Sequence, residues 1–114
     1  MIEPRLATNL QISALIKITE AQGGFATVLH KGDSISGAIL LIARIRGENP
    51  AVFERYPSLD GGSLWQAAAQ KSVVSERDMT NWLRKRCDRD PDLWLIELDV
   101  ADDKRLADII ASSP

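Results

Sequence analysis

His30 is the only histidine of the chain, and it is the first side chain to consider for acid–base or metal chemistry. It ends an expected strand and precedes Lys31-Gly32-Asp33, whose composition is typical of a turn that could expose it. No second histidine, hydroxyl nucleophile motif or plausible cysteine partner accompanies it. A half-buried or surface strand histidine is therefore the simpler interpretation, and we expect no catalytic and no metal-binding residues.

Two turns could place His30 in a ligand pocket. The segment Gly32 to Gly37 has glycines and hydroxyls that could turn backbone N–H groups toward an anion, but it lacks the lysine and following helix of a phosphate loop. A hairpin turn is the simpler interpretation. If this turn lies beside the one from Asp60 to Trp65, then His30, Asp33 and Trp65 could converge as candidate ligand-binding residues.

The densest basic cluster is Arg84-Lys85-Arg86 with Arg89, and Trp82 nearby could stack on an RNA base. Cations are also favoured at a helix C-terminus, where each offsets the helix dipole by about 0.3–1 kcal/mol. The net charge is −2, from 14 basic and 16 acidic residues, so no strong field attracts the chain to nucleic acid or an anionic membrane. We expect no nucleic-acid partner, and an RNA-associated role for Arg84–Arg89 remains an alternative.

The cysteine and the aspartates predict no cofactor. Cys87 is the only cysteine, so it forms no internal disulfide, and its spacing from Leu83 places it on the buried stripe of a helix. The alternating aspartates that begin at Asp88 resemble the start of an EF-hand loop, but Leu93 stands where that loop requires glycine. We expect an inert cysteine and a solvated acidic connection.

The elements that must position these residues follow from capping and turn signals. Thr8 can cap the first helix and Gly23-Gly24 can end it, whereas Pro91 prevents continuation of the second helix. The apolar run Ala38 to Ala43 is typical of a buried central strand, and it is far below the ~20 residues of a membrane-spanning helix. We expect a helix over 10–21, strands over 25–31, 38–45 and 51–56, a strand or helix over 63–70, a helix after Ser75, a strand over 93–98, and a short helix capped by Asp102.

The order of these elements predicts an α+β domain. With 114 residues the chain is too short for two independently cored domains, so we expect one domain over residues 1–114. Successive hairpins favour an antiparallel sheet. We predict a two-layer sandwich in the order α-β-β-β-β-α-β-α, with a mainly antiparallel sheet and the helices on one face. The pattern does not determine where the last strand joins the sheet.

The first helix has more apolar surface than one core face requires. One stripe contains Leu10, Ala14, Ile18 and Ala21. Ile12 and Ile16 fall on nearly the opposite side, which makes them candidates for an interface. A symmetric homodimer through Ile12 and Ile16 is one interpretation, and burial by neighbouring loops or by the last helix is the other.

Several segments resemble a known family. These are Glu3-Pro4-Arg5-Leu6, Gly23-Gly24-Phe25-Ala26, Lys31-Gly32-Asp33 with Gly37-Ala38, and Asp90-Pro91-Asp92-Leu93-Trp94-Leu95-Ile96-Glu97-Leu98-Asp99. Across almost the whole chain the sequence is similar to DUF1491, a bacterial domain family of unknown function. The resemblance implies a compact, stand-alone cytoplasmic domain of mainly alphaproteobacterial type. It implies no activity, cofactor or catalytic residue.

Taken alone, the sequence predicts a binding module without catalysis. The single cysteine and the lack of a charged-then-apolar leader favour the cytoplasm. Expected partners are an unidentified protein or a second copy of the chain, with no membrane. The alternative is a small ligand-binding domain or enzyme with a pocket near His30 and the Gly32–Gly37 turn.

Overall fold

The computed structural model describes residues 6–55, 65–68 and 75–114. The order of its elements is the predicted one. They are α1 (Thr8–Ala21), β1 (Phe25–His30), β2 (Ile39–Ile45), β3 (Glu48–Arg55), β4 (Gln66–Ala67), α2 (Glu76–Arg89), β5 (Trp94–Val100) and α3 (Asp103–Ser112). The predicted turn at Asp60-Gly61-Gly62 and most of the 63–70 element lie outside the described residues, but Gln66–Ala67 is strand rather than helix.

The strands form one sheet in the order β1-β5-β2-β3-β4. The β1–β5, β2–β3 and β3–β4 pairs are antiparallel, and β2 and β5 run parallel. The last strand is thus inserted between β1 and β2, which resolves the position that the sequence left open. A central place suits β5 because its apolar residues are buried on both faces of the sheet.

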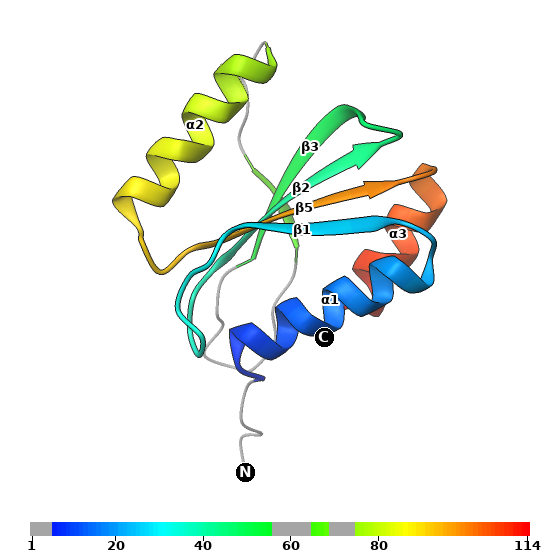
Figure 1. The fold of residues 1–114 in the computed structure, drawn as a ribbon, viewed down its shortest axis with the longest axis horizontal. Coiled ribbons are helices and arrows are strands. Elements are labelled where there is room, and N and C mark those ends of the chain that lie inside the picture. The colour runs from blue at the N-terminus through cyan, green and yellow to red at the C-terminus, as the bar shows by residue number, and fades with distance from the viewer. Residues whose placement is uncertain (1–5, 56–64, 69–74) are drawn as a thin grey trace.

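Helices cover both faces of this sheet, as Figure 1 shows, with α1 and α3 on one side and α2 on the other. The α+β class and the mainly antiparallel sheet are confirmed, but the prediction that the helices share one face is wrong. The physical reason lies in β2, where every residue from Ile39 to Ala43 is buried. A strand that is apolar on both faces needs cover on both, which one layer of helices cannot supply.

The core-facing side of α1 differs from the predicted one, although Ile18 of the predicted stripe also packs against the core. Ile12 is 3% exposed and Leu15 is 1% exposed, whereas Leu10 is 52% exposed. Ile16 is partly buried against the same core cluster. The prediction that Ile12 and Ile16 form a second surface patch is therefore wrong, because these side chains pack on the sheet.

Thr8 anchors α1 instead of capping it. The helix begins at Thr8 with Ala7 as its N-cap, and no side chain caps it. The buried Thr8 hydroxyl donates a hydrogen bond to the Gly37 carbonyl at 2.9 Å. This contact ties the start of α1 to the segment before β2, across a long sequence separation.

The other two predicted caps are present. The Ser75 hydroxyl accepts a hydrogen bond from the Asp78 amide at 3.1 Å, and the Asp102 carboxylate accepts one from the Arg105 amide at 2.8 Å. Gly23 ends α1 with φ of 79°, the left-handed conformation that favours glycine. Within the described residues, no helix has both the length and the apolar character needed to cross a bilayer.

Candidate functional site

A cavity of about 350 Å³ lies between α2 and the face of the sheet that α2 covers. Its apolar lining includes Ile42 from β2, Leu95 from β5, and Met79 and Leu83 from α2. Leu29 from β1 also lines it and is 50% exposed. We call this cavity the α2 groove.

The groove exists because α2 covers the sheet incompletely. The helix buries only Met79 and Leu83, and most of its other residues are polar or charged. One face of the helix lines the groove, in adjacent pairs of residues that repeat every four positions. That face consists of Met79, Thr80, Leu83, Arg84, Cys87 and Asp88.

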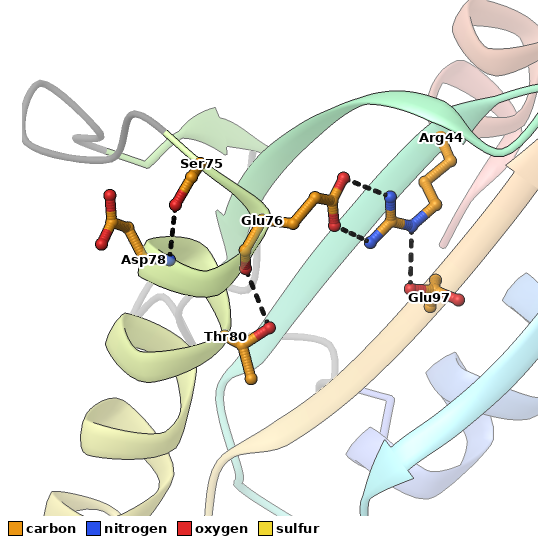
Figure 2. A network of polar contacts seen from close by, with 6 residues as sticks. All are labelled: Arg44, Ser75, Glu76, Asp78, Thr80 and Glu97. Atoms are coloured by element: carbon orange, nitrogen blue, oxygen red, sulfur yellow. Dashed lines mark hydrogen bonds and ion pairs between the residues drawn. The ribbon is translucent and has the colours of Figure 1, made fainter.

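An ion-pair network fixes the N-terminal end of α2 to the sheet (Figure 2). Both terminal nitrogens of Arg44 on β2 donate to the Glu76 carboxylate, at 2.8 and 2.9 Å, and Arg44 Nε donates to Glu97 on β5 at 3.0 Å. The hydrogen bonds that Arg44 donates to Glu76 raise the pKa of Arg44 and lower the pKa of Glu76. Arg44 therefore stays charged and joins three elements at one end of the groove.

A second contact holds α2 to β3. Arg86 pairs with Glu54 at 3.3 Å, and its guanidinium lies 5.3 Å from the centre of the Trp82 ring. This arrangement divides the basic cluster of the sequence. Arg86 is engaged within the fold, Arg84 lines the groove, and Lys85 and Arg89 are exposed.

A β-bulge places two consecutive β1 residues in the groove lining. The register of β1 against β5 shifts between Val28 and His30, so Leu29 is the additional residue. Both Leu29 and His30 line the groove. The bulge thus presents His30 on the side of the sheet that α2 covers.

The hydrogen bond of His30 determines its neutral tautomer. Nδ1 lies 2.7 Å from the carbonyl oxygen of Leu93. A carbonyl only accepts hydrogen bonds, so Nδ1 carries the proton, and in the neutral ring Nε2 is an acceptor. His30 can therefore accept a hydrogen bond through Nε2, while Nδ1 fixes the ring to Leu93, the residue before β5.

A sequence model of DUF1491, described as a protein of unknown function, matches residues 6–108 of the chain. The chain belongs to the DUF1491 family. A crystal structure of a DUF1491 protein from Caulobacter crescentus CB15 is 33% identical, with TM-score 0.73, over 85% of this chain and 90% of that one. An NMR structure of a DUF1491 protein from the same organism is 31% identical, with TM-score 0.72, over 90% and 89% of the two chains.

A third structure, of protein Atu0922 from A. tumefaciens, has 25% identity and TM-score 0.72 over 90% of this chain and 92% of that one. No curated protein gave a significant match. The family and the fold are thus known, and neither supplies a ligand for the groove.

In this DUF1491 protein the predicted ligand-binding residues do not converge. Trp65 packs against the core on the α1 side, and its Nε1 donates to the Ser113 hydroxyl at 2.9 Å. His30 lines the groove on the opposite face, so the prediction that Trp65 joins His30 in one pocket is wrong. The sequence had no signal for this, because Trp65 directly precedes a short strand and its side chain could lie on either face of the sheet.

Asp33 stabilises its own turn. Its carboxylate accepts hydrogen bonds from the amides of Ser36 and Ile35, at 2.8 and 3.1 Å, and these bonds lower its pKa. The amides that could have faced an anion are thereby used within the Gly32–Gly37 turn. A Cβ on Gly32 would clash with the Asp92 carbonyl oxygen, so the turn packs tightly on the connection before β5.

Cys87 is partly buried against the core cluster on the α2 side and lines the groove. Burial is the largest effect on its thiol and raises the pKa, so the side chain is a neutral thiol at neutral pH. Among the described residues, no three His, Cys, Asp or Glu side chains gather as a metal site. Arg44 and Glu97 were missed from the sequence, although single charges within apolar strands were a usable signal.

Proposed function

We propose that this DUF1491 protein is a non-catalytic binding module of the cytoplasm and that its ligand occupies the α2 groove. The observation that carries the proposal is the cavity of about 350 Å³ between α2 and the sheet. Small-ligand sites have volumes of about 300–1,000 Å³ and combine apolar walls with a few polar groups. The α2 groove has a volume in this range, apolar walls and a few polar groups.

The lining indicates a small amphiphilic ligand. Ile42, Leu83 and Leu95 offer an apolar surface for its body. For its polar end, His30 Nε2 offers an acceptor and Arg84 offers an exposed cation. Arg44 is an unsuitable anchor because its nitrogens already bind Glu76 and Glu97. A partner protein could present the same chemistry as a side chain.

Two features support binding rather than catalysis. Nδ1 of His30 bonds to a backbone carbonyl, not to a carboxylate as in a catalytic triad. The raised pKa of Cys87 favours the thiol, which is a poor nucleophile. The cytoplasmic assignment rests on this single free cysteine.

The test is a fluorescence titration with anilinonaphthalene sulfonate, an amphiphile of suitable size. Thr80 is exposed and lines the groove, so Thr80→Trp should fill the groove without disturbing the core. Asn81→Trp is the matched control because Asn81 is the next residue of α2, is exposed and does not line the groove. We expect saturable binding that Thr80→Trp weakens at least about tenfold and Asn81→Trp leaves unchanged.

Circular dichroism must show that both variants are folded, because loosely folded proteins also bind this dye. Amide shifts in wild-type NMR spectra should change at Met79, Ile42 and Leu95 during the titration. No binding to the wild type, or equal binding to both variants, would contradict the proposal.

A further inference from the structure

β1 is an exposed edge strand that lacks the usual protection against pairing. Among the residues that the structure describes, it pairs only with β5, on one side, and it is longer than β4, the two-residue strand at the other edge. Its sequence, Phe25 to His30, contains no acidic residue, lysine, arginine or proline. Phe25 is 75% exposed, Leu29 50% and Val28 37%. Uncharged apolar edges of this kind are sites for adding another strand.

We propose that two copies of this chain pair β1 with β1, antiparallel, about a two-fold axis at Thr27. The two sheets then form one continuous sheet across the dimer. This surface differs from the α1 interface considered from the sequence, which the burial of Ile12 removes.

The register of the β1–β1 pairing follows from which side chains of β1 lie on the same face of the sheet. Phe25 and Thr27 lie opposite Asp99 and Glu97 of β5, on the α2 side, where Leu29 also lines the groove. Ala26 and Val28 lie opposite Leu98 and Ile96, on the α1 side. Because residues that face each other in an antiparallel pair share a face, the axis must pass through a residue.

An axis at Thr27 gives favourable pairs throughout. Thr27 meets its own copy, Phe25 meets the partner's Leu29, and Ala26 meets the partner's Val28. Apolar cross-strand pairs and Thr–Thr pairs both stabilise a sheet. A slip by one residue would bring side chains from opposite faces together.

The charges around β1 favour a second copy of the chain as the strand that pairs with it. About a two-fold axis each central residue meets itself, so an uncharged strand avoids repulsion between like charges. In the same register Lys31 reaches the partner's Gly23, at the C-terminal end of α1. That helix has no basic residue in its last turn, and it carries Glu20 there. The negative end of the helix dipole and the Glu20 carboxylate favour the incoming lysine, and the contact occurs twice.

The dimer would also complete the groove. Leu29 lines the groove, and the partner's Phe25 would lie directly against it. The other copy thus contributes an aromatic side chain at the edge of the site. The dimer proposal stands without the ligand, because it depends on β1 alone.

The test is solution mass by light scattering up to about 1 mM protein, where even weak dimers form. We expect a wild-type dimer. Thr27→Lys should give a folded monomer, because Thr27 is exposed on the sheet face and two ammonium groups would meet at the axis. Thr27→Val, which adds no charge, should remain a dimer. A wild-type monomer throughout, or an equally stable Thr27→Lys dimer, would overturn the proposal.

Cross-linking tests the register, in a Cys87→Ser background that removes the native thiol. Facing residues of antiparallel strands have Cα atoms about 4.5–5.5 Å apart, within disulfide range. Thr27→Cys should therefore form a covalent dimer on mild oxidation. Phe25→Cys, which faces the partner's Leu29, should not. Cross-linking through Phe25→Cys but not Thr27→Cys would overturn the proposed pairing.

Unchanged dye binding by monomeric Thr27→Lys would show that the ligand proposal does not depend on the dimer.

Discussion

The two faces of the sheet are closed by different means. On one face, α1 and α3 pack apolar side chains against the strands, and Leu15 and Ile109 are 1% and 0% exposed. On the other, α2 contributes two buried apolar residues, Met79 and Leu83, and ion pairs with the sheet add to the contacts of its partly buried side chains. The first face is a packed core, and the second retains a cavity.

This difference indicates where stability and binding are located. Dense apolar packing supplies most of the free energy of folding, whereas exposed ion pairs contribute about 0–1 kcal/mol each. Regions with few buried contacts open at lower free energy than the core, and binding segments are drawn from such regions. We therefore expect α2 to be the least stable helix of the fold and the wall that adapts to a ligand.

The largest expected effect compares one leucine from each face. Leu15→Ala should lower the free energy of unfolding by about 3–5 kcal/mol, because its site on the sheet is closely packed. Leu83→Ala should cost about 2 kcal/mol, because Leu83 already borders the groove and α2 can move toward the sheet. Urea unfolding followed by circular dichroism measures both. Equal losses would show that the two faces are packed equally well.

A smaller effect is expected from the contact that fixes α2. Arg44→Met keeps the apolar stem and removes the ion pairs, so we expect a global loss of about 1 kcal/mol. Amide exchange should become faster in α2 and stay unchanged in α1. The control is Arg105→Met, which removes the exposed pair with Asp102 on α3. Faster exchange in both helices after Arg44→Met would mean that α2 does not open separately.

Features set by neighbouring residues could be predicted from the sequence. The caps at Ser75 and Asp102 depend on contacts within one helical turn, and both are present. The buried strand β2 was identified because its apolar run leaves no polar face. His30 was correctly placed at the end of a strand beside a turn.

Features set by contacts between residues far apart in the chain could not be predicted from the sequence. α1 has apolar residues on both sides, so its rotation depends on which side the sheet accepts, and its start is anchored by a distant contact between Thr8 and Gly37. The position of β5 in the sheet likewise reflects pairing with β1 and β2, which are far away in the chain. The groove needs both α2 and the β1 bulge, so the charges of Arg44 and Glu97, although visible within apolar strands, did not show that the two residues share a site.

The smallest expected effect is a pH dependence confined to the α2 face. Hydrogen bonds from Arg44 lower the pKa of Glu76 below its ordinary value of 4.5, so the folded state favours the carboxylate. The resulting stabilisation is complete above the unfolded-state pKa and is lost as the pH falls through the lower folded-state pKa. Wild type should therefore be more stable than Glu76→Gln near neutral pH, and this difference should close in acid. An NMR titration should give a Glu76 midpoint below 4.5 in the wild type and an ordinary midpoint in Arg44→Met. A midpoint that Arg44→Met leaves unchanged would show that the ion pair does not form in solution, and α2 would then depend on Met79, Leu83 and the Arg86–Glu54 pair for its place on the sheet.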